Sequence, residues 1–194
     1  MAVVGLKNLH YAKLTKDDDT GVTYGTPKKI APAISVQMNT NSNTATLYAD
    51  DGPAATDSAL GVTEVTINTS DLPTAVEADL LGHTINEDGV MIENSDDATP
   101  YVAIGFSSIT SDGGEMFVWL LKGKFSVPQQ NHQTKGENIE YQTPTIVGQF
   151  LKRDFDGDWR YKVRSTDDGV NAAVIANWFT EVYQETDEQE TDEI

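Results

Sequence analysis

The feature of this sequence that most limits its fold is an alternation of apolar and polar residues that recurs between clusters of turn-forming residues. In the segment Ile30–Met38 every second residue from position 34 is apolar, which is typical of a strand with one buried face. Similar patterns occupy residues 43–50 and, less regularly, residues 61–69. Strands of this kind bury their apolar faces against a second layer, so the pattern predicts an antiparallel β-protein.

Two further turn motifs, Ser111–Gly114 and Asp156-Gly157, each lie between candidate strands. Asp-Gly and Gly-Gly pairs favour the tight turns that join antiparallel strands. Both motifs therefore predict hairpins. The strands expected around them are 101–109 with 115–125, and 140–155 with 158–165.

Two segments show helical spacing instead. Leu72, Val76 and Leu80 are four residues apart, with Asp71 or Thr74 as the expected N-cap, and Gly82 is expected to end this helix. A second, C-terminal helix is predicted from residue 171, because apolar residues recur there at the same interval. They are Val170, Val174 and Trp178.

These elements predict a mainly β fold of two packed antiparallel sheets, a β-sandwich or half-barrel, flanked by a short helix and followed by the C-terminal helix. Residues 1–183 form one domain in this prediction, since no repeat or linker divides them. Residues 184–194 are acidic and almost without core residues, so they are expected to form a disordered tail.

The charge of the chain is distributed unevenly. The formal net charge is −18, yet residues 30–121 contain 14 Asp and Glu and no Lys or Arg. One interpretation of this segment is a solvated face that keeps the protein soluble. Such a segment is unsuited to gripping the phosphates of a nucleic acid.

The residues that usually carry enzyme chemistry are absent or scattered. The chain has no cysteine, which excludes disulfides, thiolate metal sites and cysteine nucleophiles. Its histidines, His10, His83 and His132, lie in three separate segments, and surface or structural roles are expected for them. We therefore expect no catalytic residues, no metal site and no cofactor.

The run Asp154–Asp158 has the alternating carboxylates of a calcium-binding loop. Its glycine stands at the fourth position instead of the sixth, and Ser165 stands where a bidentate glutamate is needed. A plain Asp-Gly turn is the preferred interpretation.

No apolar run approaches the length of a membrane span, since the longest is Met116–Leu121. The N-terminus also lacks the basic start and apolar block of a secretory signal. The product is therefore expected to stay where it is made, without a membrane partner.

Several stretches, in order along residues 30–183, resemble the major tail tube protein family of long-tailed, non-contractile bacteriophages. Each stretch is weakly specific alone, and their number and order carry the resemblance. They are Leu47–Gly52, Leu80–His83, Pro100–Phe106, Val118–Phe125, Thr143–Phe150, Asp156–Trp159 and Trp178–Val182.

The resemblance implies a structural virion protein without catalytic residues. In this family a β-sandwich with a flanking helix forms rings of six copies, whose inner strands join in one barrel. The rings stack into the tube through which DNA is ejected, and a long loop or hairpin and the terminal arms clamp successive rings. The implied partners are further copies of the chain and other tail proteins, such as the tape measure, distal tail and terminator proteins.

A conduit for DNA must not bind phosphate, because each Lys or Arg on its wall would be repeated around the ring. The segment without basic residues is therefore the one expected at the lumen, chiefly its strands around 30–50 and 60–70. Asp50, Asp51 and Glu64 are the acidic residues predicted to face the bore; solvation of the outer surface is the alternative for each.

Other functions compete with this one. Trp119, Trp159 and Trp178 would suit a secreted or virion-associated β-sandwich module that binds carbohydrate or cell wall, although core or interface positions are favoured for them. A carboxylate-based hydrolase is a further alternative. Within the tube interpretation, the tube of a phage-derived bacteriocin would carry no DNA.

Overall fold

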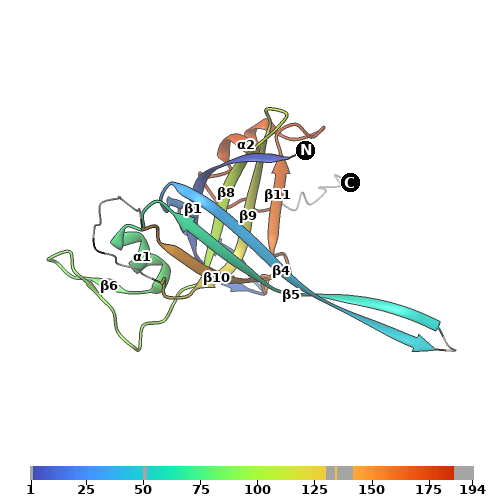
Figure 1. Cartoon of the computed structure of the whole chain (residues 1–194), viewed down its shortest axis with the longest axis horizontal. Coiled ribbons are helices and arrows are strands. Elements are labelled where there is room, and N and C mark those ends of the chain that lie inside the picture. The colour runs from blue at the N-terminus through green and yellow to red at the C-terminus, as the bar shows by residue number, and fades with distance from the viewer. Residues whose placement is uncertain (1, 50–51, 130–133, 135–141, 186–194) are drawn as a thin grey trace, which may run out of the picture.

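The fold is built around one large antiparallel sheet. The computed structural model describes residues 2–49, 52–129, 134 and 142–185 (Figure 1). The sheet has nine strands in the order β2-β1-β8-β9-β10-β5-β4, with β3 paired to β1 and β11 paired to β9. They are β1 (Val3–Asp18), β2 (Gly21–Tyr24), β3 (Lys28–Lys29), β4 (Ala33–Ala49), β5 (Gly52–Thr69), β8 (Val102–Thr110), β9 (Glu115–Phe125), β10 (Thr145–Leu151) and β11 (Arg160–Arg164).

A second, two-stranded sheet and two short helices complete the described fold. The small sheet pairs β6 (Thr84–Ile85) with β7 (Met91–Ile92), and the helices are α1 (Thr74–Leu81) and α2 (Ala172–Asn177). The predicted fold class, mainly β with antiparallel sheets and two helices, is confirmed. Neither helix is long and apolar enough to cross a membrane.

Strands β8 and β9 form the centre of the molecule because both of their faces are covered. On one face the core includes α1 and the curled-over strands β1 and β5, whereas α2 and the segment after it cover the other face. Residues of β8 and β9 therefore alternate between the two cores. The first core receives Val102, Ile104, Val118 and Leu120; the second receives Ala103, Phe117, Trp119 and Leu121.

The two helices differ in how well their ends were predicted. Gly82 ends α1 with a φ of 82°, as expected for a left-handed C-cap. The expected N-cap is wrong: Pro73 occupies that position without a side-chain cap, while Asp71 accepts a hydrogen bond from the backbone of Leu72. In the C-terminal helix, the Asn171 side chain accepts from Ala173 N and caps α2.

The alternation of residues 34, 36 and 38 overstates the burial of β4. The register with β5 shifts between Ala33 and Ser35, and Ile34 is left 54% exposed. Val36 packs against the core, whereas Met38, on the same face, is 39% exposed. A bulge of this kind places one extra residue in the strand and is invisible in a two-residue pattern.

The hairpin predicted at Asp156-Gly157 is also wrong, although the turn itself exists. Strands β10 and β11 do not pair with each other; both pair antiparallel with β9, β10 beside residues 122–125 and β11 beside residues 116–120. Residues 152–159 therefore form a loop within a nearly continuous line of strand. The hairpin predicted at Ser111–Gly114 is confirmed by the pairing of β8 with β9.

Ion pairs and a hydrogen bond at Asp79 join α1 to β1 and β3. Asp79 accepts hydrogen bonds from Tyr11 Oη at 2.7 Å, Lys13 Nζ at 2.8 Å and Lys28 Nζ at 2.7 Å. Partial burial alone would raise the pKa of Asp79, but the two ammonium groups and the phenol outweigh it and hold that pKa far below 3.8. The carboxylate is thus a stabilising group only while it is ionised.

We expect Asp79→Asn to lower the free energy of unfolding by about 1–2 kcal/mol at neutral pH, since two lysines lose their anion. The pKa of Asp79 is depressed in the folded state, so its contribution is complete above the unfolded value of 3.8 and is lost as the pH falls below it. Urea unfolding at about pH 7 and about pH 3 should show the gap between the two proteins narrowing in acid. An equal gap at both pH values would contradict this assignment.

Candidate functional site

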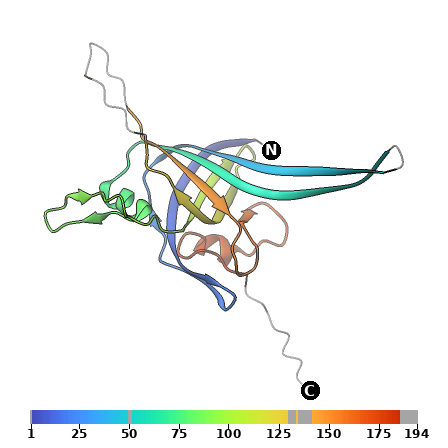
Figure 2. The ribbon, with the colours of Figure 1, turned by 90° about the horizontal axis from the view of Figure 1, so that it is seen from below.

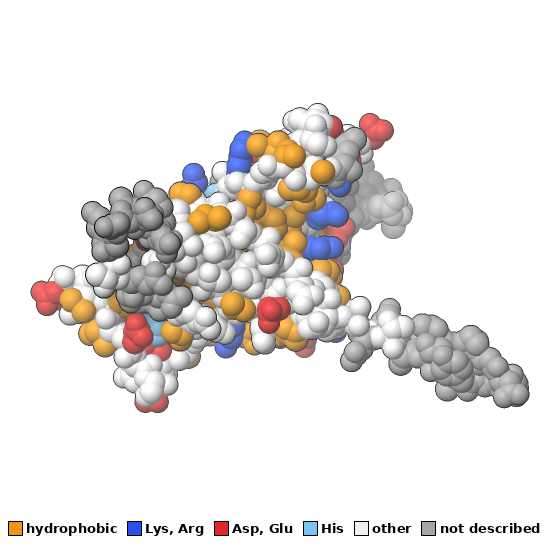
Figure 3. Space-filling view, viewed as in Figure 1, with side chains coloured by type: hydrophobic (Ala, Val, Ile, Leu, Met, Phe, Trp, Pro, Cys, Tyr) orange, Lys and Arg blue, Asp and Glu red, His pale blue; other side chains and the backbone are white. Residues whose placement is uncertain are grey.

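The outward face of β4, β5 and β10 is a continuous polar surface. The register places Asn39 beside Glu64 and Glu64 beside Gln149, and Lys124 of β9 lies at the margin of the same row. These three strands contain no Lys or Arg. Over the inner parts of β4 and β5 the surface is mostly neither charged nor hydrophobic (Figure 3). We call this surface the polar face; its described members are Ser35, Gln37, Asn39, Glu64, Thr66, Asn68, Thr145, Val147 and Gln149.

The outer part of the β4–β5 hairpin projects far beyond the rest of the molecule (Figures 1 and 2). The pairing continues from Ala33–Thr69 out to Ala49–Gly52. The side chains described in this part, Ser42, Thr44, Ala59 and Leu60, are all exposed. A two-stranded ribbon is marginally stable in water without further packing, so this segment is suited to contact another molecule.

The sequence predicted that the segment 30–121 lies at one surface, and the structure places its acidic residues in several. Glu64 is exposed on the polar face, whereas Asp79 is held by Lys13 and Lys28 on another side of the sheet. Asp50 and Asp51 lie outside the described residues, as do His132 and the predicted tail from residue 186. Four exposed acidic residues lie between α1 and β8, a grouping that sequence reasoning missed. They are Glu87, Asp88, Glu93 and Asp96.

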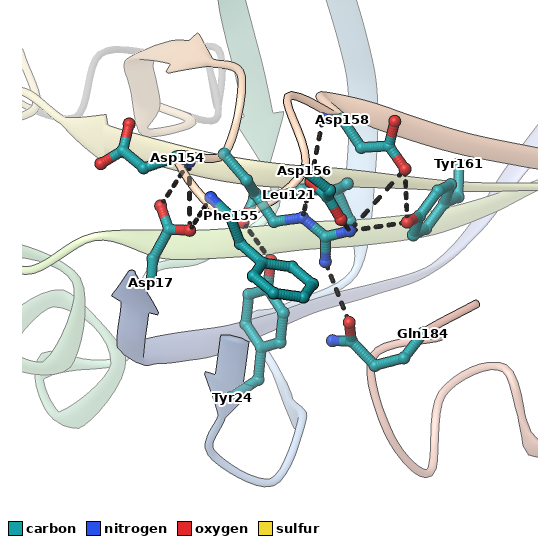
Figure 4. Close-up of polar contacts among 10 residues, drawn as sticks. Asp17, Tyr24, Leu121, Asp154, Phe155, Asp156, Asp158, Tyr161 and Gln184 are labelled. Carbon is teal, nitrogen blue, oxygen red and sulfur yellow. Dashed lines mark hydrogen bonds and ion pairs between the residues drawn. The ribbon is translucent and has the colours of Figure 1, made fainter. Parts of the chain in front are cut away.

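A network of charged side chains fixes the loop between β10 and β11 (Figure 4). Arg153 is 1% exposed, and its guanidinium donates to Asp156, to Tyr161 Oη at 2.6 Å and to Gln184 Oε1 at 3.0 Å. Desolvation, together with the hydrogen bond that its hydroxyl donates to Asp158, raises the pKa of Tyr161. The loop is therefore held to the C-terminal segment at Gln184.

The same loop is also held to the end of β1. Lys122 Nζ lies 2.6 Å from Asp17 and 2.7 Å from Asp154, and Asp17 accepts from the backbone N–H groups of Asp154 and Phe155. Burial opposes ionisation of Asp17, but these hydrogen bonds prevail and lower its pKa. Nearby, Tyr24 Oη donates to Leu121 O at 2.9 Å, and burial raises the pKa of Tyr24 to about 12.

These contacts explain why the run Asp154–Asp158 is a turn rather than an ion-binding loop. Asp154 pairs with Lys122, and Asp156 and Asp158 both pair with Arg153, so all three carboxylates already face cations of the chain. The described residues contain no group of three or more His, Asp or Glu arranged to hold a metal ion.

The tryptophans do not form a sugar-stacking surface. Trp119 is 0% exposed and donates from Nε1 to Trp178 O at 2.9 Å, while Trp178 is itself buried in the second core. Trp159 is partly buried, and the Arg160 guanidinium lies 4.4 Å from its ring centroid. Core positions are thus confirmed for two of the three, and the carbohydrate-binding alternative is not supported.

Comparison with known proteins gives one match of wide coverage. Residues 1–187 match the model of a family described as phage tail tube protein. No curated protein sequence matches the chain.

Proposed function

We propose a specific role in the tail for this chain, which belongs to the phage tail tube protein family. It is a structural component of a phage tail and assembles with itself and with other tail proteins. Six copies close into a ring, the rings stack into the tube of a long, non-contractile tail, and DNA leaves the particle through the bore. The chain is made in the cytoplasm of the host bacterium and reaches its final place in the virion.

The observation that carries this proposal is the polar face of β4, β5 and β10. Its amide and hydroxyl side chains retain water, and Glu64 adds a modest repulsion of phosphate. Duplex DNA releases bound counterions when it meets Lys or Arg, so a wall without them offers the DNA little to hold. We place the polar face at the lumen, with Glu64, Asp50 and Asp51 among the acidic residues that line it.

The projecting hairpin supplies the contact between rings in this proposal. Its outer half extends well beyond the rest of the molecule, and the side chains described there are exposed (Figure 2). Ring closure also provides partners for the edge of β4, which within one subunit pairs only with β5 among the described strands.

Negative-stain electron microscopy of the purified protein, alone and with an initiating tail complex, tests the assembly. Rings and stacked tubes are the expected result. A protein that stays monomeric at high concentration in every condition would overturn the proposal.

A charge-reversed lumen tests the role of the polar face. Phage particles with Glu64→Lys should form normal tubes but retain DNA at low salt, because each ring then presents six added cations to the duplex. About six phosphate contacts make affinity fall by about 10³ between roughly 50 and 200 mM salt, so the defect should disappear as salt rises. The measurement is the rate of DNA release as a function of salt.

Asp19→Lys is the matched control for this variant. It makes the same change of charge at an exposed residue of the β1–β2 turn. Its DNA release should equal that of the unaltered phage. If Glu64→Lys and Asp19→Lys particles release DNA at the same rate, Glu64 does not line the lumen.

A further inference from the structure

Residues 82–100, which we call the arm, extend from the end of α1 to the start of β8. The arm contains the small sheet, whose strands pair only at Thr84–Ile92 and Ile85–Met91. Its apolar side chains are unusually exposed: 38% for Ile85, 55% for Val90 and 51% for Ile92. Exposed apolar residues grouped on one projection are typical of a surface that contacts another protein.

The shape of the arm is fixed from within. His83 Nδ1 lies 2.6 Å from Asp97 Oδ2 at its base, and the Asn86 side chain accepts from the backbone N–H groups of Asp88 and Val90 at the turn. A preformed projection loses little conformational entropy when it binds. The arm is therefore suited to docking as a rigid body.

The formal charges of the arm are all negative. Its exposed acidic residues form no ion pair with any described residue, and the arm contains no Lys or Arg. They are Glu87, Asp88, Glu93 and Asp96. A partner surface must therefore offer cations next to a place for apolar side chains.

Strand β11 offers the cations, and Lys162 lines a pocket together with Val170 and Val174 that can receive apolar side chains. The sequence of β11, RYKVR, alternates cations with Tyr161 and Val163, which pack against the second core. The cations Arg160, Lys162 and Arg164 therefore share the opposite face, and none of them forms an ion pair within the described residues. β11 pairs only with β9 among the described strands, so its other backbone edge is free. We call the free edge of β11, together with Arg160, Lys162 and Arg164, the basic edge.

The arm and the basic edge cannot meet within one chain. The arm extends to one side of the molecule beside α1, whereas β11 lies across the sheet from it, and both views agree on this separation (Figures 1 and 2). Two complementary surfaces on different sides of one molecule produce a head-to-tail contact between copies. Such a contact closes into a ring or continues as a filament.

We propose that the arm of one copy docks on the basic edge of a second copy, with its acidic residues facing Arg160 and Lys162. This inference rests on the proposed function, because it names a contact between subunits of the assembled tube. It assigns recognition between copies to charge as well as to shape, so the contact weakens at high salt.

Charge reversal on each side, alone and together, tests the contact. The arm variant carries Glu87→Lys and Asp88→Lys, and the edge variant carries Arg160→Glu and Lys162→Glu. Each should raise the concentration needed for assembly by about tenfold, because several weak exposed ion pairs are replaced by repulsions. The chain with all four substitutions should assemble like the unaltered protein, since the attraction is restored with its direction reversed.

A control variant with Asp19→Lys and Asp71→Lys makes the same net change of charge as the arm variant at exposed positions elsewhere. It should assemble normally, and circular dichroism should show all four variants folded. Normal assembly of both single-side variants, or no recovery in the combined chain, would overturn the docking inference while leaving the tube function intact. Absence of rings and tubes from the unaltered protein would overturn both.

Discussion

Gly105→Ala is expected to lower the free energy of unfolding by about 3 kcal/mol and the melting temperature by about 6–12 °C. Gly105 of β8 lies directly opposite Trp119 of β9, and an added Cβ would stand 2.7 Å from three atoms of the indole ring. The ring has nowhere to move, because Trp119 is completely buried and its Nε1 is bonded to Trp178 O. The methyl group must therefore push β8 and β9 apart at the centre of both cores.

Gly5→Ala is the matched control for this substitution. Gly5 also lies in a strand paired with β8, but its added Cβ would stand 3.6 Å from Ile109, an ordinary van der Waals contact. Its cost should be about 0.5 kcal/mol or less. Thermal and urea unfolding of the two variants provide the comparison. Similar stability losses in both would show that the packing of Trp119 on Gly105 is not the cause.

The features predicted correctly from the sequence are those set by neighbouring residues. Gly82 ends α1 because glycine adopts a positive φ at little cost, and α2 begins close to the predicted residue 171. The β8–β9 hairpin follows in the same way from a short turn between two long apolar runs.

The features that could not be predicted depend on distant partners. Asp156-Gly157 makes a turn, but β11 continues along β9 instead of folding back on β10, and the ion pairs of Lys122 and Arg153 that hold this loop join residues far apart in sequence or in a loop of unpredicted course. The side of the sheet on which an acidic residue lies also depends on distant partners. Asp79, for example, bonds to Lys13, which is 66 residues away in sequence. The charge pattern therefore located Glu64 on an exposed strand but gave no sign of the arm.

The sequence of the basic edge indicates a strand, but it does not indicate that the strand lies at a free edge. The strand predicted at residues 158–165 exists as β11, in which Tyr161 and Val163 pack against the second core. The free backbone edge beside the cations of β11 follows only from the order of strands in the sheet. The order of strands in the sheet therefore identifies this amphipathic strand as a candidate contact surface.

Replacing residues 42–60 with an Asn-Gly turn is expected to abolish tube formation while leaving the body folded. The side chains described within the removed segment are exposed, and β5 keeps its pairing with β10 from Thr63 to Asn68. The new turn would join Asn41 to Gly61, whose backbones already approach closely, since a Cβ on Gly61 would stand 2.8 Å from Asn41 O. Asn-Gly is well suited to such a two-residue connection.

The expected particles are single rings without stacked tubes, because the hairpin is assigned to the contact between rings, whereas residues 33–41 of the β4 edge assigned to ring closure are retained. Electron microscopy distinguishes the outcomes, and thermal unfolding should show a stability change of about 1 kcal/mol or less, since a ribbon without its own core adds little. Adding the shortened chain to the full-length protein supplies an internal control: a copy that enters a ring but cannot reach the next one should stop tube growth. Tubes of normal length from the shortened chain would contradict the role assigned to the hairpin, whereas monomers alone would show that the hairpin also acts within the ring.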